Sequence, residues 1–426
     1  MCPVSYRVNG RGRAEVGGCD LVELARAHGT PLYVYDEETV RRRCREYVAA
    51  IGDRGDVLYS AKAFASPAFL RIVATEGLGL DVVSAGELGI ALRAGYPTQT
   101  IHFLGNNKSL QDVEAAWRAR ATLVIESFHE FDLLDRVVPA GGRMPCQVRV
   151  SPGVRPDTHH FISTGQVDSK FGFSVETGAA RAALQRALEC DRVELVGLHS
   201  HIGSQIFDLE AYSAAMEVVL DLMAEVRRNL GYQPTRVSAG GGLGIAYTTA
   251  DEPPTPTELV QRLLGWLDAG VAKRGLSTPR LEIEPGRSIA GPAGIALYTV
   301  GSIKEIPGVR RYVAVDGGMG DNIRPKLYGA RYEPFLAAHP DGAQNGVVTI
   351  AGKYCESTDI VASDVPLPAV ETGDVLAVPA AGAYCLSMSS NYNGVPRPAV
   401  VIVRDGQTIP IRRRETLDDL LAPEIL

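Results

Sequence analysis

The sequence lacks the features that mark several classes of protein. It has no apolar run long enough to cross a membrane, and no apolar core follows a basic start at the N-terminus. The seven cysteines are odd in number and widely scattered, and neither a CxxC pair nor an HExxH motif is present. These absences argue against a membrane protein, a secreted disulfide scaffold and a metal site. They favour a soluble protein of the reduced cytoplasm.

The charge and size narrow the class further. A formal net charge of -7 leaves no basic surplus for a nucleic acid or an anionic membrane surface. Apolar residues make up 45% and charged residues 22%, both near the globular average. Because 426 residues exceed what one hydrophobic core usually supports, we expect two domains.

Short β-rich runs alternate with amphipathic stretches over the first two thirds of the chain. Eight candidate strands lie at 56–60, 80–83, 101–104, 122–126, 147–151, 195–199, 235–239 and 280–284. Helical patterns between them include 67–76, 85–94, 110–118, 176–189, 209–229 and 257–274. Eight such units predict an α/β fold with a (β/α)₈ TIM barrel over residues 36–285.

The character of the sequence changes after residue 285. Strand-like runs at 296–303, 311–315, 347–350, 375–379 and 399–403 are separated by glycine, proline, asparagine and aspartate. This pattern predicts a mainly β second domain over residues 286–426. Residues 1–35 are also turn-rich and short-stranded, so we expect them to join that β domain.

Residues with charged or reactive side chains, and a run of glycines, lie at the carboxyl ends of the predicted barrel strands. Lys62 follows the first strand in YSAKAF, and His201 follows the sixth in HSHIGSQ. Glycines 240–242 follow the seventh strand, and Glu284 and Arg287 close the eighth in EIEPGR. Because active sites of such barrels gather at this face, we predict an active site there.

Each of these features also has a purely structural interpretation. A lone lysine is usually solvated, a lone histidine is often a core residue, and the glycine run lacks the spacing of a dinucleotide loop. Glu284 could belong to a structural ion pair. A lysine desolvated in a barrel mouth can instead act as an amine nucleophile, and bare N–H groups of a glycine loop can bind phosphate.

The second domain has three polar clusters: DNIRPKLYGARY (321–332), KYCESTDI (353–360) and AAGAYCLSMSSNYN (380–393). Each could be a solvated loop. Strand ends do not ordinarily gather arginine, tyrosine, cysteine, glutamate, serine and asparagine together, so we interpret the clusters as part of a site.

Taken together, these motifs resemble the fold-type III pyridoxal-phosphate decarboxylases, in the branch that acts on diaminopimelate. The resemblance also covers GTPLYVYDE (29–37), GLDVVSAGEL (79–88), GNNKS (105–109) and TGQVDSKFGF (164–173), in the family's order. It implies an alanine racemase-like barrel with pyridoxal 5'-phosphate as cofactor. It also implies decarboxylation of meso-2,6-diaminopimelate to L-lysine and CO2, the last step of lysine biosynthesis.

The resemblance implies a role for each residue of the cofactor site. Lys62 would hold the cofactor as a Schiff base, and His201 would stack on the ring. Glu284 would keep the pyridine nitrogen protonated, which makes the ring an electron sink. The other implied cofactor contacts are Asp81, Ser204, Gly241, Gly242, Gly286, Arg287 and Tyr384.

The resemblance also implies a substrate site at a homodimer interface. Arg287, Arg324 and Tyr328 would hold the distal carboxylate of the substrate. Cys355 and Glu356 would enter from the second subunit, with Glu356 on the distal amine and Cys355 as proton donor. The implied catalytic set is Lys62, His201, Glu284 and Cys355, and the substrate-binding set is Arg287, Arg324, Tyr328, Glu356 and Tyr384.

Three alternatives remain open at this point. A racemase of the same fold would place an arginine, not Glu284, near the pyridine nitrogen. A decarboxylase for lysine, ornithine or a secondary-metabolite intermediate would have no distal carboxylate for Arg324 and Tyr328 to bind. A non-catalytic cofactor-binding protein would be expected to have lost Lys62, Glu284 or Cys355.

Overall fold

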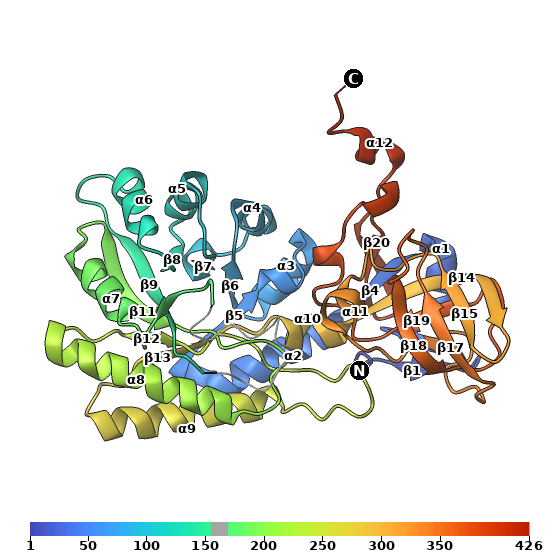
Figure 1. Cartoon of the computed structure of the whole chain (residues 1–426), viewed down its shortest axis with the longest axis horizontal. Helices are drawn as coiled ribbons and strands as arrows, with labels where there is room; N and C mark the ends of the chain where they lie inside the picture. The colour runs from blue at the N-terminus through green and yellow to red at the C-terminus, as the bar shows by residue number, and fades with distance from the viewer. Residues whose placement is uncertain (155–168, 426) are drawn as a thin grey trace. The chain divides into compact units, whose positions relative to one another are not determined.

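The computed structural model describes residues 1–154 and 169–425, so residues 164–168 of the TGQVDSKFGF motif lie outside the described residues. The chain divides into two compact units. Residues 1–42, 245–252 and 289–426 form the first, here called the β unit, and residues 43–244 and 253–288 form the second, the barrel unit. Figure 1 follows the chain in colour from end to end.

The barrel unit is built on eight parallel strands. They are β5 (Gly55–Ser60), β6 (Gly79–Val82), β7 (Ile101–Phe103), β8 (Thr122–Ile125), β9 (Met144–Ser151), β11 (Val193–His199), β12 (Arg236–Ser238) and β13 (Arg280–Ile283). The ring is closed because β13 pairs with β5 and β8 pairs with β9. A short strand, β10 (Phe173–Ser174), adds to β9. The predicted (β/α)₈ barrel is therefore confirmed, and each of its strands overlaps a predicted run.

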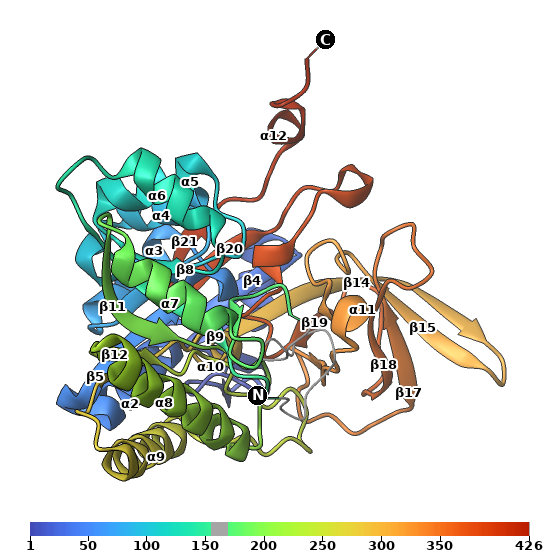
Figure 2. The same ribbon diagram turned by 60° about the vertical axis from the view of Figure 1, so that its left-hand side comes forward.

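Helices cover the outside of this ring (Figures 1 and 2). They are α2 (Glu37–Ile51), α3 (Pro67–Thr75), α4 (Ala85–Ala94), α5 (Leu110–Ala119), α6 (His129–Val137), α7 (Ala179–Glu189), α8 (Glu210–Leu230) and α9 (Pro256–Arg274). Several begin at a hydroxyl residue that caps the first turn: Ser66, Ser84, Ser109 and Thr255 each accept a bond from the N–H three residues on. The sequence analysis did not specify α2 or α6.

The β unit contains a long mixed sheet. In spatial order its strands are β18 (Ile360–Pro366), β17 (Val347–Ala351), β15 (Arg310–Val315), β14 (Gly294–Ile306), β4 (Leu32–Asp36), β20 (Ala399–Arg404) and β21 (Gln407–Arg412). Strand β19 (Val375–Val378) pairs with β14 and with β16 (Phe335–Leu336). Strand β4, from the start of the chain, lies between β14 and β20, so the two ends of the sequence share one sheet.

Smaller elements complete the β unit. Strands β1 (Arg7–Val8), β2 (Ala14–Val16) and β3 (Cys19–Asp20) form a separate antiparallel sheet, followed by α1 (Leu21–His28). Helix α11 (Arg324–Tyr328) carries part of the first polar cluster, and α12 (Leu417–Leu421) lies near the C-terminus. Helix α10 (Arg287–Ala293) spans the junction of the two units in sequence. A shared apolar core joins β2, α1, β4, β14 and β20.

A fully buried lysine ties together two strand ends of the barrel. Lys108, in the GNNKS motif, donates from Nζ to the Glu130 carboxylate at 2.7 Å and to the carbonyls of Gly105 and Val124 at 2.7 and 2.6 Å. All three N–H donors of the Lys108 ammonium group therefore have a hydrogen-bond acceptor. Glu126 continues the network, since it accepts from the Gly105 N–H at 2.8 Å and pairs with Arg149 at 2.9 Å.

We expect Lys108→Met to lower the free energy of unfolding by about 3–5 kcal/mol, because it leaves the Glu130 carboxylate buried without its cation. Chemical denaturation followed by circular dichroism measures the loss. Arg118→Met removes an exposed partner of Glu114 on α5 and serves as the matched control, with an expected cost below about 1 kcal/mol. Equal losses in the two variants would contradict this argument.

Asp321 is a buried acid in the core of the β unit. Its carboxylate accepts hydrogen bonds from the hydroxyls of Tyr298 and Tyr33 at 2.5 and 3.1 Å, and from the Gly318 N–H at 3.0 Å. Burial nevertheless raises the pKa of Asp321 to about 6. A raised acid pKa favours the neutral form in the folded state, so its contribution to stability is full below about pH 4 and is lost as the pH rises to about 6.

Asp321→Asn should remove this pH dependence. Relative to the variant, the wild type should lose about 2 kcal/mol of unfolding free energy between pH 4 and pH 6. Urea titrations at intervals across this range measure the difference. Parallel stability curves for the two proteins would show that Asp321 does not titrate in this window.

Candidate active site

Lys62 lies where the sequence analysis placed it, directly after the first barrel strand. It stands in a single 3₁₀ turn, Ala61–Ala63, that follows β5. Its two alanine neighbours are buried, and the lysine itself is half-buried. A Cβ added at Gly286 would lie 3.1 Å from the Ala63 Cβ and 3.0 Å from the Ser60 Cβ, so the eighth strand end packs against the turn of Lys62.

Glu284 is a buried carboxylate at the end of β13. His199 Nε2 lies 3.0 Å from the carboxylate, and Ser238 Oγ donates to it at 2.8 Å. Burial by itself disfavours the charge, but His199, Ser238 and the nearby His201 outweigh it and hold the pKa of Glu284 well below its usual range. The carboxylate is therefore ionised, and two neighbouring strands fix its orientation.

His201 follows β11 and faces the same region. Its Nδ1 accepts a hydrogen bond from the Gly241 N–H at 3.2 Å. Burial of the ring lowers the pKa of His201 well below its usual value, and the positive charges of Lys62 and Arg149 lower it further. The imidazole is thus neutral.

The glycine run after β12 leaves no room for side chains. A Cβ at Gly241 would lie 2.1 Å from the Glu284 carbonyl oxygen, and one at Gly242, whose φ is +113°, would lie 2.4 Å from the Gly203 oxygen. On the neighbouring strand ends, Arg287 Nη2 donates to Ser204 Oγ at 2.8 Å. Bare backbone amides, a hydroxyl and a guanidinium thus occur at adjoining strand ends, which is a donor set suited to a phosphate.

Asp81 lies inside the barrel on β6. Its Oδ2 accepts from Ser60 Oγ at 2.6 Å, whereas its buried Oδ1 has no hydrogen-bond partner within residues 1–154 and 169–425. Burial raises the pKa of Asp81, and the charge of Lys62 opposes that rise. His199 Nδ1 is likewise buried without a partner in the described part of the chain.

The barrel residues fit pyridoxal phosphate. The set combines an amine, an ionised carboxylate, a neutral imidazole, phosphate donors and two unsatisfied buried polar atoms in one barrel mouth.

Among the described residues no group of three or more histidine, cysteine, aspartate or glutamate side chains could hold a metal ion. No helix in the same residues is long and apolar enough to cross a membrane.

The other predicted site residues belong to the β unit. Arg324 is buried at the start of α11, and Tyr328 is half-buried at its end. Cys355 and Glu356 are exposed in a turn after β17, and Tyr384 is half-buried with a φ of +59°. The approach of these residues to the barrel site stays a prediction.

Within the β unit the third polar cluster contacts both others, since Cys385 Sγ lies 3.5 Å from the Tyr332 hydroxyl of the first cluster and Asn393 binds the second. The buried Asp359 of the second cluster accepts from the N–H groups of Met319 and Tyr354 at 2.7 and 2.9 Å. The Cys355 N–H donates to Asn393 Oδ1 of the third cluster at 2.9 Å. The turn that presents Cys355 and Glu356 is therefore shaped by contacts from segments distant in sequence.

Several residues of the barrel mouth were not predicted from the sequence. His199 and Ser238 stand two positions before His201 and Gly240, and the period of two along a strand could have indicated that they face inward. Glu87, in the GLDVVSAGEL motif, accepts from the Val83 N–H at 2.8 Å, and burial raises its pKa to about 7. No sequence signal distinguished Glu87 from a surface helix residue.

Comparisons with known proteins agree with this geometry. Residues 37–291 match the family model described as pyridoxal-dependent decarboxylase, pyridoxal binding domain. The chain is 45% identical to a diaminopimelate decarboxylase of Bacillus methanolicus over 96% of both chains, and 45% identical to that of Mycobacterium tuberculosis H37Rv over 96% of this chain and 94% of the relative.

Solved structures give the same result. Diaminopimelate decarboxylase from M. jannaschii in complex with L-lysine matches 100% of this chain and 99% of its own, with a TM-score of 0.92 and 36% identity. A lysine/ornithine decarboxylase from Vibrio vulnificus, at 22% identity and a TM-score of 0.75, shares the fold. From the barrel, its lysine and carboxylate, and these matches, the chain belongs to the diaminopimelate decarboxylase family of pyridoxal-dependent decarboxylases.

Proposed function

We propose that this protein removes CO2 from meso-2,6-diaminopimelate and releases L-lysine, with pyridoxal phosphate held on Lys62. The observation that carries the reaction type is the ionised Glu284, fixed by His199 and Ser238 in the same barrel mouth as Lys62. The substrate is proposed from the relatives, which are named diaminopimelate decarboxylases at 45% identity over nearly the whole chain.

The barrel residues hold and tune the cofactor in this proposal. When bound, pyridoxal phosphate supplies an electron sink for the electrons of the broken C–C bond. Glu284 holds a proton on the ring nitrogen, and His201 covers one face of the ring. Ser204, Gly241, Gly242, Gly286 and Arg287 hold the phosphate, with Tyr384 from the β unit, and Asp81 lies beside Lys62.

The β unit contributes the substrate contacts. Arg324 is a buried cation that has no carboxylate partner within the described residues, which supports its pairing with the distal carboxylate of a substrate. Tyr328, together with Arg287 from the barrel unit, completes that contact, and Tyr384 also binds the substrate. Glu356 binds the distal amine, and Cys355 delivers a proton to the α-carbon after CO2 has left.

We further propose a homodimer in which Cys355 and Glu356 act in the partner's site. Both side chains are exposed on a turn that Asp359 already shapes, which supports their insertion into another surface. A cytoplasmic location is proposed as well, supported by seven cysteines that are odd in number and widely scattered along the sequence. The presence of Glu284 argues against racemase activity. An ionised carboxylate at the ring nitrogen stabilises the carbanion that decarboxylation requires.

Lys62→Ala tests the cofactor anchor. The purified variant should lose the visible absorption band of the bound cofactor and all measurable CO2 release, because no other amine takes its place. Lys273→Ala, at an exposed position on α9, is the control and should keep both. Full turnover by Lys62→Ala would overturn the assignment of the active site.

A substrate panel tests the substrate. CO2 release should be fastest with meso-diaminopimelate and much slower with lysine, ornithine and arginine, since these lack the distal carboxylate that Arg324 binds. A higher kcat/KM for lysine than for diaminopimelate would reject the substrate and leave the reaction type intact.

Subunit complementation tests the shared site. Lys62→Ala and Cys355→Ala should each be inactive alone, while an equimolar mixture, after subunit exchange, should recover about a quarter of the wild-type activity, because half the dimers contain one intact site. A mixture that stays inactive, although exchange is demonstrated with labelled subunits, would place Cys355 in the site of its own chain.

A further inference from the structure

Arg324 is a buried cation whose surroundings are unusual. Its side chain belongs to a residue that is only 4% exposed, and it forms no ion pair with any acidic residue that the structure describes. One guanidinium nitrogen, Nη1, donates to the Tyr332 hydroxyl at 2.7 Å, and Nε is buried without a hydrogen-bond partner in the described chain. Because an unpaired buried charge costs several kcal/mol, this arrangement fits a group that receives its anion from a ligand.

Two tyrosine rings enclose the guanidinium. Arg324 Cζ lies 4.4 Å from the centre of the Tyr247 ring and 5.8 Å from that of Tyr332. The rings meet edge to face, with centres 5.4 Å apart at 88°. The electron-rich ring faces stabilise a cation without neutralising it, so the hydrogen-bond donors of Arg324 stay available for a carboxylate.

The hydroxyl of Tyr332 is fixed on two sides. It accepts from Arg324, and it also lies 3.5 Å from Cys385 Sγ, which is buried in the third polar cluster. Tyr332 therefore determines the direction of the guanidinium by a hydrogen bond as well as by its ring.

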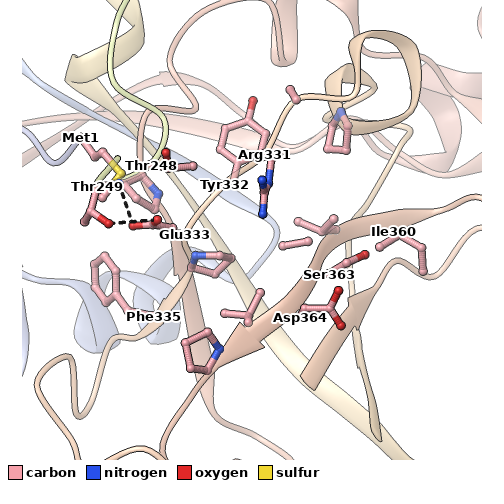
Figure 3. A pocket seen from close by; sticks show the side chains of 18 of the residues that line it. Met1, Thr248, Thr249, Arg331, Tyr332, Glu333, Phe335, Ile360, Ser363 and Asp364 are labelled. Atoms are coloured by element: carbon pink, nitrogen blue, oxygen red, sulfur yellow. Dashed lines mark hydrogen bonds between the residues drawn. The ribbon is translucent and has the colours of Figure 1, made fainter. Parts of the chain in front are cut away.

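Tyr247 comes from a distant part of the sequence, and its segment is anchored to Glu333, the residue after Tyr332. Its segment, 245–252, belongs to the β unit although it follows a barrel strand. The Thr249 N–H and hydroxyl donate to the Glu333 carboxylate at 3.1 and 3.2 Å, and Asp251 accepts from the Tyr247 N–H at 2.9 Å. Figure 3 shows Thr249 and Glu333 joined in this way, beside Tyr332, at the wall of a cavity of about 970 Å³.

From these contacts we propose that Tyr247 and Tyr332 are positioning residues that aim the Arg324 guanidinium at the distal carboxylate and so determine the preference for a dicarboxylate substrate. The inference rests on the proposed function. A planar guanidinium binds a carboxylate in two parallel hydrogen bonds only if its plane is held, and the two rings and the Tyr332 hydroxyl hold that plane. A diamino acid with a single carboxylate has no second carboxylate for Arg324 to bind. Its affinity should therefore not depend on Tyr247 and Tyr332.

The test compares variants that remove one contact each. Tyr332→Phe removes the hydrogen bond and keeps the ring, and Tyr247→Leu removes a ring. Each should raise KM for meso-diaminopimelate about tenfold, a loss of about 1.4 kcal/mol, with kcat within about twofold of wild type. Neither should change kcat/KM for lysine. Titration calorimetry with pimelate, a dicarboxylate without amines, should show the same loss of affinity.

Conservative and remote variants serve as controls. Tyr247→Phe keeps the ring face and should restore the wild-type KM. Tyr312→Leu removes a ring that faces Arg310 elsewhere in the β unit, 5.8 Å away, and should leave KM for diaminopimelate unchanged. A purely structural role would instead lower the unfolding midpoint in Tyr332→Phe and Tyr247→Leu while KM for diaminopimelate stays at the wild-type value.

Failure of this inference is distinguishable from failure of the proposed function. If Arg324→Lys raises KM for diaminopimelate while Tyr332→Phe and Tyr247→Leu do not, only the positioning role is overturned. If Arg324→Lys leaves that KM unchanged, the carboxylate contact itself is wrong. If Tyr247→Leu does not fold, Tyr332→Phe with pimelate decides the outcome alone.

Discussion

The buried negative charge of Glu284 constrains the rest of the barrel site. A carboxylate this far from water stays ionised only because His199 and Ser238 hydrogen-bond to it from two neighbouring strands. Those contacts require the carboxyl ends of β11, β12 and β13 to lie side by side. The register of the parallel pairing between these strands brings the ends together. The glycine run after β12 is part of the same constraint, since a side chain at Gly241 would collide with the Glu284 backbone.

In the proposed reaction, the two units contribute different kinds of chemistry. The barrel unit holds groups that fit a phosphorylated pyridine ring: Lys62, His201, Glu284 and the glycine loop. The β unit holds groups that fit the far end of a substrate, chiefly Arg324 and the turn with Cys355 and Glu356. This division explains why the motifs of the second half of the chain are needed to specify a substrate, whereas those of the first half specify only a cofactor. The segment 245–252 belongs to the substrate side although it lies among the barrel strands in sequence.

Prediction from the sequence succeeded where a local pattern carries the information. The eight barrel strands were predicted because a buried strand appears in the sequence as a short run rich in β-branched residues. Lys62, His201 and Glu284 were proposed as site residues because active-site residues of such barrels follow the strands. Helix α6 was missed although four of its nine residues are apolar, and β21 was missed because none of its side chains is buried, so it leaves no strong apolar pattern. His199 and Arg149 were not predicted as site residues. Their roles become evident only from their contacts with Glu284 and Glu126, which lie on other strands.

The sequence by itself determined the fold class and the family, because these depend on periodicity and on motifs read along the chain. Only the tertiary structure decided which side chains meet. It joined His199 at the end of β11 to Glu284 after β13, with β12 between them, and it enclosed Arg324 between Tyr247 and Tyr332, which are 85 residues apart. It also placed Asp359 against the turn of Cys355. The physical reason is that a hydrogen bond or a ring contact acts over a few ångströms in space, and no local pattern records which distant segments the folded chain brings within that range.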